Sequence, residues 1–456
     1  MQPNQLKLTF CGGVGQVTGA NFLLENDSIK ILIDCGLLQG VATANAWNSA
    51  PFFYNPAEID MLFVTHAHLD HVGRIAKLVH DGFKGVIYST PETKSLARLI
   101  MEDAFAIMKR EMARDGRNPI YDIGDVEQAH KIWKKISYHT RTEIPGGLSV
   151  YLKDAGHILG SAMIEFTYGK KKIVFTGDLG NSPTPLLQDT EIITDADYLV
   201  MESVYGDRNH EPVKERKEKL ERIINESVAR GGALVIPAFS TERTQVILYE
   251  MNSLVETGKI PKIPVFVDSP LAIKVTDIYK TATEHFKPSV QAEIHGGDDI
   301  FNFPKLQFTV NREASEAIDR VSNPKIILAG AGMSNGGRIT HHEMKYLPDP
   351  KSTLLFVGYQ SAGTLGREIQ SGVKNITLFG TKVPVLATID TIYGYSSHKD
   401  SDHLVEFVST TKDTVKKVFV VMGETKSALF LVQRLRDYIG VNAVHPELND
   451  SVILDF

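Results

Sequence analysis

One short segment, Thr65–His71 with the sequence THAHLDH, constrains this chain more than any other. It follows a run of mainly apolar residues that we interpret as a buried strand. Side chains alternate along a strand, so His66 and His68 leave the same face of an extended segment. Asp70 and His71 come after the strand, on the turn into a helix, where they can approach a second point. The loop therefore offers two separate ligand pairs, the arrangement expected for two adjacent divalent metal ions.

The length of 456 residues exceeds what one compact core usually holds, which predicts two domains. Apolar residues make up 43% and charged residues 23% of the chain, as in ordinary globular proteins. A formal net charge of −6 excludes a globally basic surface. Binding to a polyanion would therefore depend on a local basic patch or on bound metal.

Cysteine content and hydropathy bear on the compartment. The two cysteines, Cys11 and Cys35, each end a predicted strand, and we interpret them as core thiols. Free thiols are typical of a reducing compartment. The sequence has no run of roughly 18 apolar residues, and its start lacks the features of a signal peptide. We expect a cytoplasmic protein without a membrane partner.

The first two hundred residues alternate strand-like runs with turns, and include helical stretches such as 91–110. Several predicted strands end in a residue with a reactive side chain, namely Asp34, His66, Asp178 and Glu202. In a layered α/β scaffold, such strand ends meet at one edge of a sheet. The pattern predicts an α/β fold with a site at the strand ends.

The pattern changes to βαβ from about residue 209. A charged helix at 211–229 leads to a predicted strand at 233–237 and a helix at 241–257. The alternation that follows indicates a parallel sheet that forms its own domain. The last seventy residues return to strand-like runs and end with a helix at 427–438, capped by Gly440.

Three further residues extend the set of candidate ligands. Asp178 follows a predicted strand, where a carboxylate can bridge two metal ions through its two oxygens. His157 lies in a segment flanked by glycines, which allow close backbone approach. Asp34 is suited to orienting a ligand imidazole. Each residue alone would more often be structural, but together with Thr65–His71 they predict a metal centre.

A second group of motifs lies further along the chain, at Glu202–Arg208, Pro237–Phe239, Gly332–Met333, Gly337–Arg338, Gly358–Gln360 and Ser397–Asp400. With the ligands above, these motifs resemble the β-CASP branch of the metallo-β-lactamase superfamily, the nucleases related to the cleavage subunit of the mRNA 3′-end machinery. The resemblance implies an αββα metallo-β-lactamase sandwich with an inserted parallel-sheet β-CASP domain. Its expected parts are the first portion of the sandwich at 1–207, the insertion at 208–386 and the C-terminal completion at 387–456.

The resemblance also implies roles for the site residues. Carried over residue by residue, the zinc ligands are His66, His68 and His157 for one ion and Asp70, His71 and a bridging Asp178 for the second. Glu202 and His398 match the acidic and histidine motifs that assist the chemistry. Nitrogen and carboxylate ligands would also accept manganese.

One position departs from the family pattern. Met422 stands where the last motif has a histidine for the second metal. A thioether is a poor zinc ligand, and methionine is better suited to core packing. We therefore expect a core side chain at Met422 and a second metal site with fewer protein ligands.

The implied function is that of a ribonuclease on single-stranded RNA, an endonuclease that could also degrade RNA from 5′ to 3′. A metal-activated hydroxide would attack the phosphodiester, and His398, tuned by Glu202, would protonate the leaving oxygen to leave a 5′-phosphate. We expect Arg338 and Ser334, beside or within the glycine-rich loop 330–337, to contact substrate. A plain tight turn is the alternative for this loop.

Other functions stay open at this point. They are a DNA-directed nuclease of the same branch, a hydrolase of small esters or thioesters, and a non-catalytic scaffold if the second metal site is lost. Adjacent His341 and His342 would point about 100° apart on a helix, which favours a surface or hinge feature over a metal pair. The sequence leaves a homodimer open as well.

Overall fold

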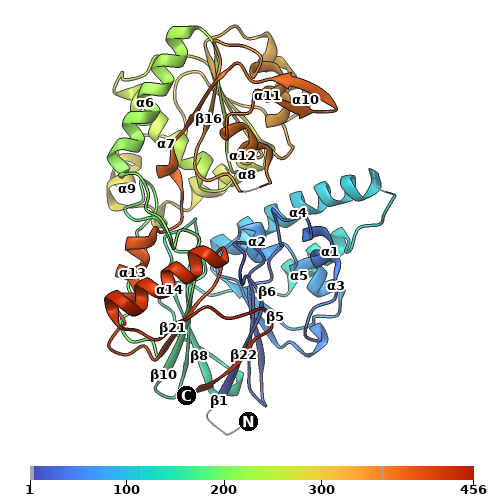
Figure 1. The fold of residues 1–456 in the computed structure, drawn as a ribbon, viewed down its shortest axis with the longest axis vertical. Coiled ribbons are helices and arrows are strands. Elements are labelled where there is room, and N and C mark those ends of the chain that lie inside the picture. Colours follow the sequence, from blue (N-terminus) through green and yellow to red (C-terminus); the bar gives the residue numbers. More distant parts are fainter. Residues whose placement is uncertain (1–4, 115, 362) are drawn as a thin grey trace. The chain divides into compact units, whose positions relative to one another are not determined.

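The computed structural model describes residues 5–114, 116–361 and 363–456, and the chain forms two compact units (Figure 1). Unit 1 comprises residues up to Thr184, Gln188–Asn209 and His398–Phe456, whereas unit 2 comprises Pro185–Leu187 and His210–Ser397. Unit 2 is thus inserted into the chain of unit 1. The domain boundaries expected at 207 and 386 stay predictions. Among the described residues, no helix has both the length and the apolar character needed to span a membrane.

Unit 1 contains two seven-stranded sheets. The first has the strand order β22 (Ser451–Asp455), β1 (Gln5–Gly12), β2 (Asn21–Glu25), β3 (Lys30–Ile33), β4 (Met61–Phe63), β5 (Val86–Ser89) and β6 (Trp133–Lys135). The second has the order β21 (Ala443–Val444), β20 (Lys417–Val420), β11 (Tyr198–Met201), β10 (Lys171–Phe175), β9 (Ala162–Tyr168), β8 (Leu148–Asp154) and β7 (Thr142–Ile144).

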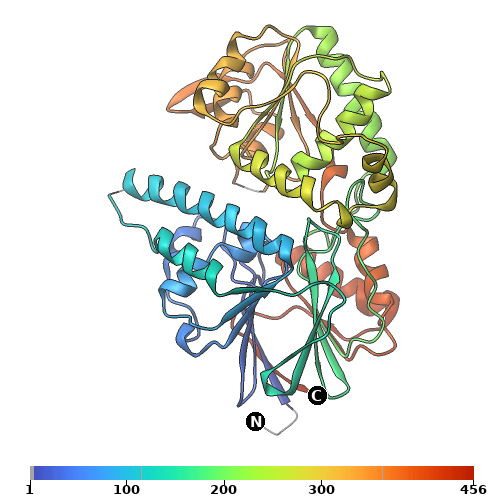
Figure 2. The same ribbon diagram turned by 180° about the vertical axis from the view of Figure 1, so that it is seen from behind.

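Helices cover the outer faces of both sheets (Figures 1 and 2). The helices outside the first sheet are α1 (Ala44–Ser49), α2 (Leu69–Val72), α3 (Ile75–His80), α4 (Pro91–Arg114) and α5 (Ile123–Lys131). The helices outside the second are α13 (Ser401–Ser409) and α14 (Thr425–Ile439). The expected αββα sandwich is therefore confirmed.

The core of unit 1 lies between the two sheets. Along β1 the side chains alternate between half-buried and buried, as expected for a strand with one face on a core. Phe63 of β4 meets Phe166 of β9 edge to face, with 5.1 Å between ring centroids. Phe10 of β1 lies 5.3 Å from Phe419 of β20. These buried aromatic pairs connect one sheet to the other.

The C-terminal segment of unit 1 completes both sheets. β22 pairs with β1 in an antiparallel ladder that joins Gln5 to Asp455. β20 is parallel to β11 and lies between β11 and β21. Helix α14 ends at Gly440, whose φ of 72° confirms the predicted left-handed cap.

Unit 2 is built on a six-stranded sheet in which all neighbouring strands are parallel, as predicted. Its order is β14 (Leu306–Phe308), β13 (Val265–Asp268), β15 (Lys325–Ala329), β12 (Ala233–Pro237), β16 (Thr353–Phe356) and β19 (Thr388–Thr391). β17 (Asn375–Leu378) and β18 (Thr381–Pro384) form a separate hairpin. The helices are α6 (Val213–Arg230), α7 (Arg243–Glu256), α8 (Pro270–Thr281), α9 (Pro288–His295), α10 (Arg312–Ala317), α11 (Ile339–Tyr346) and α12 (Leu365–Gln370).

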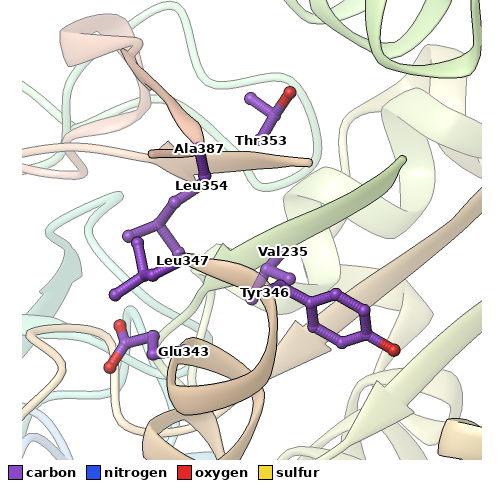
Figure 3. A pocket seen from close by; sticks show the side chains of 7 residues that line it. All are labelled: Val235, Glu343, Tyr346, Leu347, Thr353, Leu354 and Ala387. Carbon is purple, nitrogen blue, oxygen red and sulfur yellow. The ribbon is translucent and has the colours of Figure 1, made fainter. Parts of the chain in front are cut away.

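A carboxyl group is buried in the core of unit 2. Figure 3 shows Glu343 of α11 among the side chains that line a small pocket, which include Leu347 and Leu354. Only 1% of Glu343 is exposed, and its Oε2 has no hydrogen-bond partner among the described residues. Its Oε1 accepts a hydrogen bond from the Ser334 hydroxyl. Because burial raises the pKa of Glu343 to about 8, this carboxyl is mostly protonated at neutral pH.

Candidate metal centre

The histidine segment follows β4 directly. The strand ends two residues earlier than expected, since the Thr65 N–H donates to the Asp34 carboxylate at 2.8 Å and not to a neighbouring strand. His68 then precedes α2 in an extended conformation, and its carbonyl accepts the His71 N–H at 2.9 Å. Asp70 and His71 consequently lie within α2, because this short helix begins earlier than the sequence indicated.

Three imidazoles and one carboxylate converge at the strand ends of unit 1. Nδ1 of His68 lies 3.1 Å from Nε2 of His66 and 3.2 Å from Nε2 of His157. Oδ2 of Asp178 lies 3.4 Å from Nε2 of His66 and 3.5 Å from Nε2 of His157. The four ligand atoms all lie within 4.8 Å of one another. The structure thus brings together residues that are more than a hundred positions apart in the sequence.

These separations fit a tetrahedral divalent metal ion. Zinc–nitrogen distances near 2.0–2.1 Å place tetrahedral ligand atoms roughly 3.3 Å apart. Burial, together with neighbouring imidazoles, lowers the pKa of His66 and brings the pKa values of His68 and His157 well below the ordinary range. Neutral imidazole is the form that binds metal. Both the geometry and the protonation state suit a metal at this position.

A second candidate position lies beside the first. Nε2 of His71 and Oδ1 of Asp178 are 3.5 Å apart and buried, and neither has a hydrogen-bond partner within the described part of the chain. Burial raises the pKa of Asp70, the charge of His71 lowers it in part, and the charge of Asp178 raises it again. Buried polar atoms without partners call for an explanation. A second metal ion between these residues would provide one.

Asp34 holds His71 in place. Its Oδ2 lies 2.7 Å from Nδ1 of His71 and accepts the Thr65 hydroxyl at 2.8 Å. Burial lowers the pKa of His71, but the charges of Asp178 and Asp34 outweigh this effect and raise the pKa well above its ordinary value. With Nδ1 bound to Asp34, Nε2 is directed at the site, which is the contact expected of a residue that orients a metal ligand.

His398, which follows the insertion in the sequence, reaches the same site. An isolated bridge pairs it with Gly180, two residues after Asp178. Nδ1 of His398 lies 3.3 Å from Oε1 of Glu202 and 3.9 Å from Oδ2 of Asp178. Burial lowers the pKa of His398, but the two carboxylates outweigh it and raise the pKa to about 9. His398 therefore holds a proton at neutral pH in the metal-free chain.

Met422 lies in the core, as expected from its sequence context. It is 2% exposed and belongs to the apolar cluster between the two sheets. Its N–H donates to the Gly13 carbonyl at 2.7 Å, and a Cβ at Gly13 would lie 3.2 Å from Cγ of Met422. The Met422 side chain thus packs close to the backbone of Gly13.

The two predicted substrate contacts, Arg338 and Ser334, lie in unit 2. Nη1 of Arg338 donates to Oδ1 of Asp268 at 2.6 Å, and 23% of the Arg338 side chain is exposed. Ser334 is fully buried; its hydroxyl donates to Glu343 and its N–H to the Ala331 carbonyl. Because the hydroxyl of Ser334 donates to Glu343 of α11 and its N–H donates within the loop, a substrate contact there stays a prediction without a free donor to support it.

The structure corrects the prediction for the adjacent histidines. His341 is exposed and stacks on Phe379 with 4.7 Å between centroids, so the surface prediction holds for this residue. It is wrong for His342, which is 4% exposed and whose Nε2 lies 2.7 Å from Oδ2 of Asp268. Asp268, which binds Arg338 and His342 together, was missed by the sequence reasoning. The sequence feature that could have drawn attention to Asp268 is its position at the end of a predicted strand, directly before Ser269 and Pro270.

The αββα sandwich and its His/Asp cluster define the metallo-β-lactamase class, whose fold binds divalent metal. Family models match residues 23–204 as a metallo-beta-lactamase superfamily domain, 244–369 as a Beta-Casp domain and 382–446 as a Zn-dependent metallo-hydrolase RNA specificity domain. This chain belongs to the β-CASP family of metallo-β-lactamase hydrolases, which confirms the resemblance drawn from its motifs.

Individual relatives cover nearly the whole chain. Ribonuclease TTHA0252 of Thermus thermophilus is 36% identical over 92% of this chain and 94% of its own length. Transcription termination factor FttA of Methanosarcina mazei is 31% identical over 93% of this chain and 68% of that protein. A solved structure of a protein of unknown function from Enterococcus faecalis, 13% identical, has a TM-score of 0.58 over 99% of this chain and 100% of its own, which bears on the fold alone.

Proposed function

We propose that this chain is a metal-dependent ribonuclease that hydrolyses phosphodiester bonds of single-stranded RNA, chiefly as an endonuclease. The cluster of His66, His68, His157 and Asp178 carries the proposal, because its geometry fits a buried metal ion. The match to an RNA specificity domain and the likeness to a ribonuclease support RNA as the substrate.

We propose zinc as the metal, with the ligands His66, His68, His157 and Asp178 for one ion and Asp70, His71 and Asp178 for a second. When bound, the ions would polarise the phosphate and lower the pKa of a water molecule so that hydroxide attacks phosphorus at neutral pH. The nitrogen-rich first site suits zinc. The second site, with one imidazole and two carboxylates, suits manganese as well.

The chain's own residues would supply the proton for the leaving group. Burial lowers the pKa of His398, but Glu202 at 3.3 Å and Asp178 raise it, which favours the protonated imidazole. Donation of that proton to the departing 3′ oxygen would leave a 5′-phosphate on the downstream fragment. Glu202 would keep the imidazole oriented and charged between turnovers.

Substrate binding in unit 2 would involve Arg338. Since Asp268 holds only one nitrogen of its guanidinium, the exposed remainder of the side chain can bind a phosphate oxygen.

Cys11 and Cys35 are free thiols, which is consistent with action in a reducing compartment such as the cytoplasm.

His68→Ala tests the proposal, with His80→Ala as the matched control, because the His80 side chain on α3 is 51% exposed. Metal per chain is measured by elemental analysis, and cleavage of labelled single-stranded RNA and DNA is followed in parallel. We expect wild type and His80→Ala to bind metal and cut RNA. His68→Ala should lose metal and cut RNA at least a hundredfold more slowly. Mutating a residue that only orients a metal ligand already costs roughly 10–100-fold in metal affinity or activity, and loss of a ligand itself should cost no less.

Three outcomes would contradict the proposal in different ways. Undiminished RNA cleavage by His68→Ala would exclude the metal cluster as the active site. Cleavage of DNA but not RNA would identify a DNA-directed nuclease. Metal-free wild-type protein without any cleavage would leave only a scaffold role.

A further inference from the structure

Phe239 lies at the edge of the unit 2 sheet where ligands are expected. The six parallel strands end at this edge, and open parallel sheets bind ligands beyond the carboxyl ends of their strands. Phe239 and Ser240 follow β12, Ser269 follows β13, and the loop 330–337 follows β15. Phe239 is 37% exposed although it stands so close to a strand of the core.

The ring of Phe239 rests on peptide backbone. A Cβ at Gly332 would lie 2.8 Å from Cδ2 of the ring, so only glycine allows this approach. The Gly332 carbonyl accepts a hydrogen bond at 3.0 Å from Nε2 of Gln360, which is 2% exposed. Asn335, further along the loop, accepts the Leu365 N–H of α12 at 2.9 Å. The surface beneath the ring is therefore fixed by two neighbouring segments.

The backbone of Phe239 is fixed as well. Its carbonyl accepts the Thr244 hydroxyl at 2.7 Å, and the preceding Ala238 N–H donates to the Ala329 carbonyl at 3.0 Å. Cζ of Arg243 lies 6.0 Å from the ring centroid, near the outer limit of a cation–π contact. A single exposed phenylalanine is ordinary. A rigid ring with a supported face, however, loses little conformational freedom when a planar ligand stacks on it.

The loop that supports the ring leads to a guanidinium held in position. The Gly330 carbonyl accepts the Ile339 N–H at 2.9 Å, which closes the loop just after Arg338. Burial raises the pKa of Asp268, but hydrogen bonds from four residues, with His342 foremost, outweigh it and lower the pKa to about 2. The ionised Asp268 therefore keeps Arg338 oriented, and a cationic donor directly follows the loop that supports the ring of Phe239.

We infer that Phe239 stacks on a nucleobase of the single-stranded substrate while the loop ending at Arg338 binds an adjacent phosphate. The inference rests on the proposed ribonuclease function and names a binding subsite for it. Every base can stack on the ring, because each base has a π face. The subsite would therefore bind the strand without sequence specificity. An aromatic ring beside hydroxyls and a cation suits a nucleotide better than an apolar protein segment.

Binding of a phosphorothioate RNA 12-mer, measured by fluorescence anisotropy, tests the inference. The same measurement is made with a backbone of equal length that lacks bases. Phe239→Ala and Phe239→Leu remove the π face, and the leucine keeps the apolar volume if alanine disturbs folding. Phe239→Trp restores stacking. Phe379→Ala is the control, because Phe379 is 61% exposed in the same unit but lies in the turn between β17 and β18.

We expect Phe239→Ala and Phe239→Leu to weaken binding of the base-bearing RNA about tenfold, within the roughly 5- to 150-fold range of one stacked base. Binding of the abasic backbone should be unchanged, and Phe239→Trp and Phe379→Ala should match wild type. Two results would overturn the stacking subsite alone, provided that wild type still binds and cleaves RNA. In one, Phe239→Ala and Phe239→Leu lose equal affinity for the RNA and for the abasic backbone. In the other, these variants bind RNA as tightly as wild type. If wild type neither binds nor cleaves RNA, the proposed function falls with it.

Discussion

The buried carboxyl of Glu343 predicts that unit 2 loses stability as the pH rises. Burial raises the pKa of this group from 4.5 to about 8 in the folded chain. Between these values the folded chain keeps a proton that the unfolded chain has released. Folding therefore takes up a proton, and the free energy of unfolding falls with rising pH until the folded group itself ionises. Glu343→Gln removes this titration.

The size of the effect follows from the width of the pH window. Each pH unit between 4.5 and about 8 lowers the unfolding free energy by about 1.4 kcal/mol, which amounts to roughly 5 kcal/mol in total. The amide oxygen of glutamine can still accept the Ser334 hydroxyl, so the contact with the loop is kept. In a domain of this size about 1 kcal/mol corresponds to roughly 2–4 °C in Tm. The advantage of the variant should therefore grow by about 10–20 °C across the window.

Thermal unfolding of the full chain from pH 5 to pH 9 tests this reasoning. A constant difference between wild type and Glu343→Gln reflects packing, so the quantity of interest is how that difference changes with pH. Glu368→Gln on α12 is the control, since its carboxyl is exposed. A gap that widens with pH only for Glu343→Gln supports the buried carboxyl. Parallel profiles for all three proteins would refute it.

Three further changes test the metal centre. Asp34→Asn should weaken metal binding about 10–100-fold in competition with a chromophoric chelator, because His71 loses the group that orients it; an unchanged affinity would contradict this role. Met422→Leu should leave metal per chain unchanged and cost less than about 1.5 kcal/mol of stability, as a volume-conserving core exchange, whereas a loss of metal would reveal a thioether ligand. Removing metal with a chelator should lower the Tm and added zinc should restore it, since a ligand of the folded state stabilises it; a Tm indifferent to zinc would argue against the site.

The parts of the fold and site that depend on local pattern could be predicted from the sequence. The THAHLDH segment marked a cluster of candidate ligands, and the structure brings His66 and His68 of this segment together, although β4 ends before them and Asp70 and His71 lie in α2. The parallel sheet of unit 2 follows from its βαβ alternation, and Gly440 ends α14 as its position indicated. His157 and Asp178 joined this segment in the predicted metal centre because of their residue types and strand-end positions, and the family resemblance added which ion each residue would bind.

The features that depend on tertiary contacts escaped prediction. Thr65 carries a strand-like pattern, yet its N–H turns to Asp34, and β4 ends before it. His342 looked like a surface residue because a helix pattern alone does not show which side faces the core. Asp268 resembles many strand-end aspartates until Arg338 and His342 are seen to converge on it. Each case needed a partner from another segment.

The insertion of unit 2 fixes the order in which the site is made during synthesis. Glu202 and its partner His398 are separated by 196 residues. At roughly 5–20 residues per second, a ribosome needs about 10–40 s to add that stretch. Throughout this interval the nascent chain has its histidine cluster but lacks the imidazole that would protonate the leaving oxygen. On the proposed mechanism, a half-made chain lacks its proton donor and would cut the message from which it is being translated about 10²–10⁴-fold more slowly.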